Sequence, residues 1–316
     1  MDFFCESCVD SEKKVEIRAG RVIFCKKTSC KIQNGNTKLP ASNLLFIHGS
    51  CAASMQYNNL IESMKNHCQH GIPEVNSQKK EGIPSKMNFY SFDQLGCGES
   101  RHPSSDWYAF STENLITDLK IVCSQIKQSE SSSPLHLVAH SHGCSQVIQL
   151  LNSPQIHSRI AGIILIGGAL KGGPAALAKD GGHVIFKILP TFILNRLQPS
   201  LSNSFFNAAV HPNHHDKLRN SSLEISNSNS MEFCKAYYRQ QKYASIEEAS
   251  KIKTPALVIH GANDMIFPVQ AGVHLSETLQ NSHFITVDES SHQCFEERPD
   301  IVARFILKYV LDGTTQ

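Results

Sequence analysis

The stretch LVAHSHGC (137–144) places a serine between an apolar run and a glycine, with a histidine on each side. The residues that lead into it, SPLHLVAH (133–140), are typical of a buried strand, and HGCSQVIQLL (142–151) has the apolar spacing of a helix. Ser141 is therefore predicted to lie in a tight turn between a strand and a helix. Such a turn lifts the serine hydroxyl above the end of a sheet, next to a helix N-terminus.

A serine in this kind of turn needs small residues two positions away on each side, because the strand and the helix pass close together there. In this chain those positions hold Ala139 and Gly143, so one of them carries a methyl group where the common pattern has glycine. One methyl group is small enough for a close contact between strand and helix. The turn therefore fits a serine nucleophile.

Strands and helices alternate on both sides of this turn. Apolar runs typical of buried strands recur at residues 43–47, 87–93, 159–169, 254–260 and 283–288, and residues 15–26 have the pattern of a hairpin that turns at Gly20. Helical patterns occur between them at 54–68, 111–127 and 268–280, and a last one at 300–311. This order predicts an α/β fold with a mostly parallel central sheet and helices on both faces.

The alternation stops between residues 170 and 250, where glycine pairs, Pro190 and a Ser/Asn-rich segment occur. We expect 170–250 to form an inserted, largely helical cap. The core is then one discontinuous domain of residues 1–169 and 251–316, with a polar surface insertion at 71–86.

One apolar stretch of the cap, HVIFKILPTFILNRL (183–197), has two interpretations. It is typical of a lid over an acyl pocket, which we favour. The alternative is a helix that makes peripheral contact with a membrane.

Composition excludes some classes of partner. With 30 Lys and Arg against 28 Asp and Glu, the formal net charge is +2, so the chain has no basic field for nucleic acid. No run approaches the roughly 18 apolar residues that span a bilayer, and the N-terminal residues lack the pattern of a signal peptide. We therefore expect a cytoplasmic protein whose 11 cysteines are mostly free thiols.

Four cysteines near the N-terminus are candidate ligands of one metal site. Cys5 and Cys8 form a C-x2-C pair, and Cys25 and Cys30 form a wider one. Four thiolates at such spacings can bind zinc. The wide second pair and the strand-like alternation around Cys25 favour free or buried cysteines instead.

Several motifs occur in an order that is found in one large family. They are LLFIHGS (44–50), FDQLGCGES (92–100), VAHSHG (138–143), HGAND (260–264) and SSH (290–292). With these motifs the chain resembles the α/β-hydrolase-fold superfamily, serine-hydrolase type, in the group of monoglyceride-lipase-like and "α/β-hydrolase domain-containing" proteins. The resemblance runs from about residue 14 to 311; it is weakest in the cap and absent from the insertion.

A serine nucleophile needs a base within hydrogen-bond reach, and the base needs a carboxylate to orient it. His140 and His142 are poor bases for Ser141, because neighbours in a sharp turn point away from its side chain. His292 fits best, since it follows the last strand and precedes the final helix. The resemblance implies Asp264 as the acid, in the chain order Ser, Asp, His.

Two other carboxylates compete with Asp264 for this role. Asp288 follows the last strand, and Asp93 belongs to a turn of the form D-x-x-G-x-G-x-S. His48 and His260, which each precede a glycine at a strand end, are interpreted as scaffold residues.

Two backbone N–H groups are expected to form an oxyanion hole. One comes from His142, at the start of the helix after the turn. The other comes from the loop after residues 43–47, where Ser50 is the first choice and Cys51 the second.

The segment HPNHHD (211–216) has the form of an acyltransferase motif, and its three histidines suggest a metal site. It lies in the cap rather than at a strand end. A solvated loop is therefore the favoured interpretation.

Taken with the resemblance, these residues predict a serine hydrolase that cleaves a carboxylic ester of a hydrophobic acid, such as a lipid, through an acyl-enzyme intermediate. No cofactor and no metal are implied, and the partner is a small-molecule or lipid ester. Thioester or amide cleavage needs the same groups. The alternatives are an acyltransferase, or a ligand receptor or interaction protein that retains the fold.

Overall fold

The computed structural model describes residues 10–71, 82–103, 106–153, 156, 160–174 and 184–312. Cys5, Cys8 and most of the expected insertion at 71–86 lie outside the described residues, so the prediction of a surface insertion stays a prediction.

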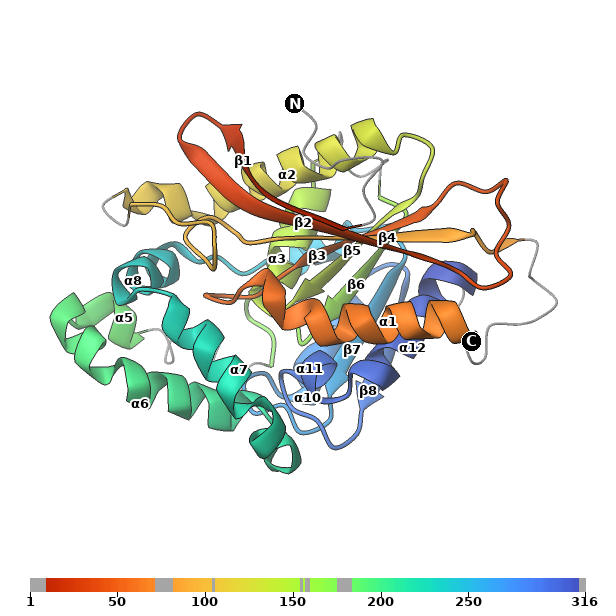
Figure 1. Ribbon diagram of the computed structural model, residues 1–316. Helices are drawn as coiled ribbons and strands as arrows, with labels where there is room; N and C mark the ends of the chain where they lie inside the picture. Colours follow the sequence, from red (N-terminus) through yellow and green to blue (C-terminus); the bar gives the residue numbers. More distant parts are fainter. Residues whose placement is uncertain are drawn as a thin grey trace.

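An eight-stranded sheet forms the centre of the molecule (Figure 1). Its spatial order is β1-β2-β4-β3-β5-β6-β7-β8, in which β1 pairs with β2 and β2 with β4 in antiparallel fashion, and the other pairs are parallel. The strands are β1 (Asp10–Arg18), β2 (Arg21–Lys31), β3 (Ser42–Ile47), β4 (Lys86–Phe92), β5 (Leu135–His140), β6 (Gly162–Ile166), β7 (Ala256–Gly261) and β8 (Ser282–Val287). The mostly parallel sheet predicted from the alternation is confirmed.

Helices cover both faces of this sheet, as predicted. The helices outside the cap region are α1 (Asn58–His70), α2 (Thr112–Ser129), α3 (His142–Leu151), α10 (Val269–Thr278), α11 (Cys294–Glu297) and α12 (Pro299–Asp312), with the short 3-10 helices η1 (Ser54–Tyr57) and η3 (Trp107–Phe110). Of these, the sequence patterns missed η3 and the short helix α11. Helix α11 begins two residues after His292, and its residue Glu296 lines part of the site described below.

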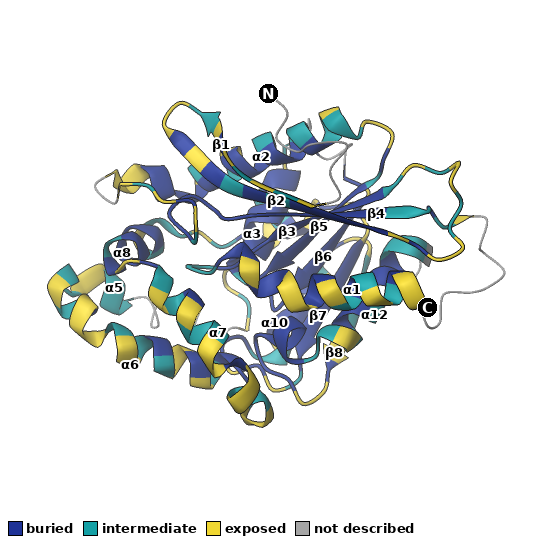
Figure 2. Cartoon of the chain, in the orientation of Figure 1, coloured by how far each residue is buried: buried dark blue, intermediate teal, exposed yellow. Residues whose placement is uncertain are grey.

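Two separate hydrophobic clusters hold these layers together, because alternate side chains of a strand point to opposite faces. Leu45 of β3 belongs to the cluster that includes residues of α2 and α3. Phe46, the next residue, belongs to the cluster that includes residues of α1 and α12. Figure 2 shows the central strands buried throughout, as expected for a parallel sheet with helices on both faces.

The cap region gathers helices that lie to one side of the sheet (Figure 1). They are α5 (Val184–Ile188), α6 (Thr191–Ala209), η4 (Pro212–His214), α7 (His215–Ser228) and α8 (Met231–Gln240). The next helix, α9 (Ile246–Ser250), contacts α3 and α10 of the core. Figure 2 shows much of α6 and α7 exposed, in contrast to the strands.

Cys25 and Cys30 lie on the same strand, β2, but belong to the clusters on opposite faces of the sheet. One zinc ion therefore cannot bind both thiolates, which removes the four-cysteine site left open by the sequence. Burial also raises the pKa of Cys25 to about 12, so its thiol stays protonated. Within the described ranges, no helix has the length and apolar character needed to cross a bilayer.

Candidate active site

Ser141 lies in a strained turn between β5 and α3. Its backbone has φ 53° and ψ −123°, outside the regions that side-chain-bearing residues normally adopt, and its N–H donates to the Ile166 carbonyl group of the neighbouring strand. Such strain persists only where the surroundings impose it, and it is common at functional sites. The predicted turn is therefore present at the predicted residue.

Glycine is needed after Ser141 but not before it. A Cβ atom added to Gly143 would lie 2.8 Å from the Ile47 carbonyl oxygen and 2.9 Å from that of His48. A Cβ atom on Gly49 would similarly lie 3.0 Å from the Cβ atom of Ser141. Ala139 is fully buried in the core, and its methyl group is accommodated there.

His292 and Asp264 form a buried pair next to this turn. The Nδ1 atom of His292 lies 2.8 Å from the Oδ2 atom of Asp264, and both side chains are almost completely buried. Because the ionised carboxylate accepts this hydrogen bond, the hydrogen of His292 is on Nδ1. The Nε2 atom is then left with a lone pair, as a general base requires.

Asp264 is held by further donors. Its Oδ1 atom accepts the backbone N–H groups of Ile266 and Phe267, each at 2.8 Å, and its Oδ2 atom lies 3.2 Å from Nε2 of His260. Burial alone would raise the pKa of Asp264, but the charge interaction with His292 and the hydrogen bonds from His260 and His292 together lower it well below its usual value. Asp264 is thus an ionised carboxylate, both oxygen atoms of which have hydrogen-bond donors.

The two competing carboxylates are placed differently. Asp93 accepts the backbone N–H groups of Ser54, at 2.7 Å, and Glu99, at 2.8 Å, and so closes a structural turn. Asp288 is exposed on the surface after β8. Of the three carboxylates, the one that contacts His292 is Asp264.

The histidines on either side of Ser141 connect the turn to other parts of the molecule. The His140 Nε2–H group donates to the backbone carbonyl of His292 at 3.0 Å, and its ring lies 4.7 Å from the His292 ring, centre to centre. The His142 ring contacts the cap, with Nδ1 2.7 Å from the Tyr237 hydroxyl and Nε2 2.9 Å from the Lys242 carbonyl. Both rings therefore make hydrogen-bond contacts with other segments of the chain.

The other predicted histidines also have structural contacts. His48 is fully buried, and its Nε2 atom accepts the backbone N–H of Gln94 at 2.9 Å. His260 is fully buried as well and donates from Nε2 to the Phe267 carbonyl at 2.9 Å. The scaffold interpretation is confirmed for both, but the contact of His260 with Asp264 could not be seen in the sequence.

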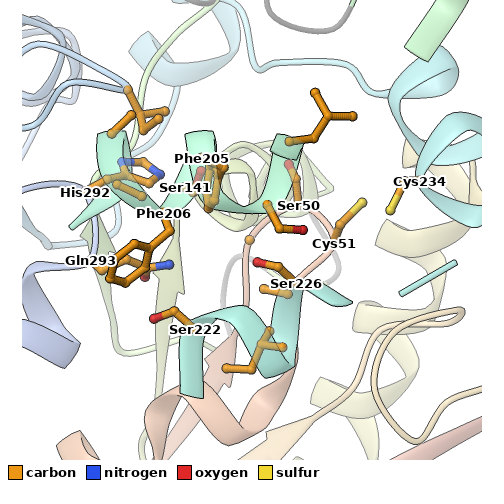
Figure 3. A pocket seen from close by; sticks show the side chains of 18 of the residues that line it. Ser50, Cys51, Ser141, Phe205, Phe206, Ser222, Ser226, Cys234, His292 and Gln293 are labelled. Atoms are coloured by element: carbon orange, nitrogen blue, oxygen red, sulfur yellow. The ribbon is translucent and has the colours of Figure 1, made fainter. Parts of the chain in front are cut away.

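A cavity of about 410 Å³ opens beside Ser141 and His292 (Figure 3). Ser50 and Cys51 of the loop after β3 line it, as do His140 and several residues of the cap. The apolar part of its lining is formed mainly by Ile185, Phe186, Leu201, Phe205, Phe206, Val210, Ile225, Met231, Tyr238, Ile266 and Phe267. Ser141 and His292 thus line one largely apolar cavity, and Asp264 contacts His292. The catalytic roles of these three residues, predicted from separate motifs, stay predictions.

The expected oxyanion-hole residues are next to this site. Ser50 lines the cavity, and His142 is the first residue of α3. The backbone of Cys51 has a positive φ of 48°, which marks a sharp change of direction in the loop directly after Ser50. Their N–H groups remain the predicted donors to the oxyanion.

The histidines of HPNHHD have other partners. His214 and His215 each lie within hydrogen-bond distance of a backbone carbonyl group, that of Glu289 at 3.1 Å and that of Val210 at 2.9 Å. In the described part of the chain, no cluster of three His, Cys, Asp or Glu residues could hold a metal ion. The segment forms η4 and the start of α7 rather than an open loop.

Comparisons with known proteins agree with this architecture. The protein ABHD8 of Homo sapiens is 28% identical to the chain over 178 residues, which are 55% of this chain and 39% of that protein. The chain therefore spans about two fifths of the length of these curated relatives. The uncharacterized hydrolase YugF of Bacillus subtilis is 33% identical over 64 residues, 20% of this chain and 23% of that protein.

Solved structures share the fold over almost the whole chain. An esterase from Exiguobacterium antarcticum superposes with a TM-score of 0.75 at 16% identity, covering 95% of this chain and 99% of that one. An esterase from Thermogutta terrifontis gives a TM-score of 0.69 at 14% identity, covering 96% and 100%. The profile of the family described as "Serine aminopeptidase, S33" matches residues 84–299. The chain therefore belongs to this S33 family of serine-hydrolase-type α/β-hydrolases.

Proposed function

We propose that the protein is a serine hydrolase that cleaves a carboxylic ester of a hydrophobic acid through an acyl-enzyme intermediate. The observation that carries the proposal is that Ser141 and His292 line a single cavity and that His292 is paired with the ionised Asp264. Membership of the S33 family supports it independently.

In the proposed reaction the Ser141 hydroxyl attacks the ester carbonyl carbon while Nε2 of His292 takes its proton. Asp264 stabilises the positive charge that develops on His292, and the N–H groups of Ser50 and His142 donate to the oxyanion. The alcohol leaves with the proton from His292. Water then attacks the acyl group on Ser141 by the reverse sequence, which releases the acid and restores the serine.

The lining of the cavity supports a hydrophobic acyl group. Leu201 and Phe206 of α6 and Met231 of α8 form part of its wall. A series of p-nitrophenyl esters from acetate to dodecanoate should therefore show kcat/KM rising with chain length. A steady preference for acetate would contradict the hydrophobic acyl group but leave the reaction itself intact.

A fluorophosphonate probe tests the nucleophile. We expect wild-type protein to be labelled and Ser141→Ala to be unlabelled. Ser226→Ala is the matched control, because Ser226 lines the same cavity but has no proposed base beside it. If folded wild-type protein resists labelling, the alternative of a non-enzymatic receptor on this fold replaces the hydrolase. Transfer of the acyl group to an added alcohol in preference to water would indicate an acyltransferase.

We also propose that the outer face of the cap contacts an anionic membrane surface. Ile188 and Phe192 are 70% and 67% exposed, and residues 184–209 contain Lys187 and Arg196 but no acidic residue. Apolar and basic side chains together suit an anionic lipid surface. Vesicles of phosphatidylserine and phosphatidylcholine should sediment the wild type but not Ile188→Ser/Phe192→Ser, and equal sedimentation of both proteins would refute the contact.

A further inference from the structure

One wall of the cavity is polar, and the proposed reaction does not use it. Glu296 of α11 lines the cavity although only 4% of its surface is exposed. Gln293, the N-cap residue of α11, and Gln56 of η1 line the cavity as well. Because α11 contacts η1, these three side chains come from two neighbouring elements.

These polar groups lack the partners that buried groups normally have. The Oε1 atom of Gln293 makes no hydrogen bond within the described chain. The amide nitrogen of Gln56 lies near the Tyr57 hydroxyl group, but it makes no hydrogen bond of good geometry there, and that hydroxyl donates to the Ile47 carbonyl. Within the same described ranges, the Glu296 carboxyl group has neither a hydrogen bond nor an ion pair.

A buried carboxyl group without a partner is costly unless it is neutral. Burial, and then the negative charge of Glu297, raise the pKa of Glu296 to about 8. Near neutral pH it is therefore mostly a carboxylic acid, which both donates and accepts hydrogen bonds. No Lys or Arg is among the described residues that line the cavity, so an anionic ligand would meet no opposite charge.

The place of this wall indicates which part of a substrate it faces. In the proposed reaction His292 returns its proton to the leaving alcohol, so the alcohol must lie against His292. Gln293 follows His292 directly. Figure 3 shows Gln293 on the same side of the pocket as His292, away from Cys51 and Cys234.

We propose that Gln56, Gln293 and Glu296 form a subsite for a neutral, hydroxyl-bearing alcohol part of the ester. A hydroxyl group can accept from Glu296 or from the Gln56 amide and can donate to Oε1 of Gln293. An ammonium group could pair with the two acceptors but would leave the Gln56 amide nitrogen facing a cation. The inference rests on the proposed ester hydrolase and adds to it the chemical class of the alcohol.

Two esters of equal size test the subsite. 2-Hydroxyethyl octanoate and propyl octanoate differ in one hydroxyl group in place of a methyl group at the end of the alcohol. We expect wild-type kcat/KM to favour the hydroxyethyl ester by about tenfold, as one well-placed hydrogen bond does. In Glu296→Leu the ratio should fall to about one, with the propyl ester changed by less than about threefold. Glu296→Gln, which keeps a donor and an acceptor, should retain most of the preference.

Control variants and binding measurements separate this inference from the proposed reaction. Ser226→Ala, in the same cavity, should keep the wild-type ratio. An unchanged preference in folded Glu296→Leu would overturn the subsite. A stronger preference for 2-(trimethylammonio)ethyl octanoate, lost in Glu296→Gln, would also overturn it, in favour of a cationic alcohol.

Binding of the two uncleaved esters to Ser141→Ala, with and without Glu296→Leu, gives a readout that needs no turnover. Tighter binding of the hydroxyethyl ester that depends on Glu296 supports the subsite even if the wild type cleaves neither ester. In that case the proposed hydrolase activity is refuted, and the proposed subsite is not. Equal binding of both esters to Ser141→Ala would overturn the subsite whatever the wild type cleaves.

Discussion

The loop that carries Asp264 and the helix that carries Glu296 each bury one carboxyl group at the site, in opposite surroundings. Asp264 accepts hydrogen bonds from His292, His260 and the backbone N–H groups of Ile266 and Phe267. Glu296, within the described chain, has no such donor. The pKa of Asp264 is accordingly lowered, and that of Glu296 is raised to about 8.

This difference supports the two roles that we propose for the same functional group in one fold. Donors aimed at Asp264 keep it charged despite its burial, so it can orient a histidine and stabilise its positive form. Burial without donors keeps Glu296 neutral, so it can donate to a ligand. The charge of each group follows from its neighbours rather than from its residue type.

The largest expected effect is on kcat, where variants of Asp264 and of Glu296 should differ. Asp264→Asn should lower kcat for a p-nitrophenyl ester by about 10³–10⁴-fold, because the amide no longer fixes the His292 tautomer. Glu296→Gln should change kcat for the same ester by less than about threefold. Similar losses in both variants, with both proteins folded, would remove the distinction drawn here.

The next effect is on stability as a function of pH. An unfolded chain ionises Glu296 near its ordinary pKa of 4.5, whereas the folded protein holds the proton up to about 8. Between these values the folded state binds more protons, so the free energy of unfolding falls as pH rises, by up to about 1.4 kcal/mol per pH unit. The contribution is complete below pH 4.5 and is lost as the pH approaches and passes about 8.

Urea denaturation between pH 5 and pH 8.5 measures this slope. Glu296→Gln should show a shallower decline than wild type. Glu297, whose pKa burial raises to about 7, remains in both proteins and accounts for part of the residual slope. Parallel curves for the two proteins would show that Glu296 is ionised in the folded state.

A smaller effect is expected from the loss of His260, which contacts Asp264 and is not proposed to contact the substrate. His260→Ala removes the imidazole 3.2 Å from the Oδ2 atom of Asp264, and we expect kcat to fall about tenfold as the carboxylate loses one constraint. His136→Ala is the matched control, because His136 is a buried histidine of β5 that packs against Tyr309 instead. If His136→Ala lowers kcat equally, the loss reflects general destabilisation.

The smallest effect concerns Glu297, which is intermediate between the two cases. It accepts the backbone N–H of Ser291 at 3.1 Å and that of His211 at 3.3 Å. Glu297→Gln keeps an acceptor for these N–H groups and removes the cost of ionising a carboxyl group whose pKa burial raises to about 7, so the free energy of unfolding at pH 8 should rise by about 1 kcal/mol. A decrease on urea denaturation would show that the backbone hydrogen bonds to the ionised Glu297 outweigh the cost of burying its charge.

Much of this arrangement could be predicted from the sequence because it depends on local patterns. The strands that end just before Ser141 and shortly before Asp264 are short apolar runs, and parallel strands bring their carboxyl ends to one edge of the sheet. His292 follows the last such run. Each residue therefore carries a local signal of its own, and the parallel sheet brings the signals together.

The remaining features depend on contacts between distant segments, which leave no local signal. His140 and His142 are separated by one residue, yet one contacts the His292 loop and the other contacts the cap. Glu296 lies in EERP (296–299), a pattern that is typical of an ordinary charged helix N-terminus. Its burial follows from the contact between α11 and η1, which no periodicity in the sequence predicts.

Trapping the acyl-enzyme shows whether Ser141 is the nucleophile. Wild-type protein mixed with p-nitrophenyl octanoate and quenched in acid within one turnover should gain the mass of one octanoyl group, and fragmentation of peptide 128–159 should place it on Ser141. Ser141→Ala should gain no such mass. Octanoate release without an adduct on Ser141, or an adduct that maps to Cys51, would exclude Ser141 as the nucleophile.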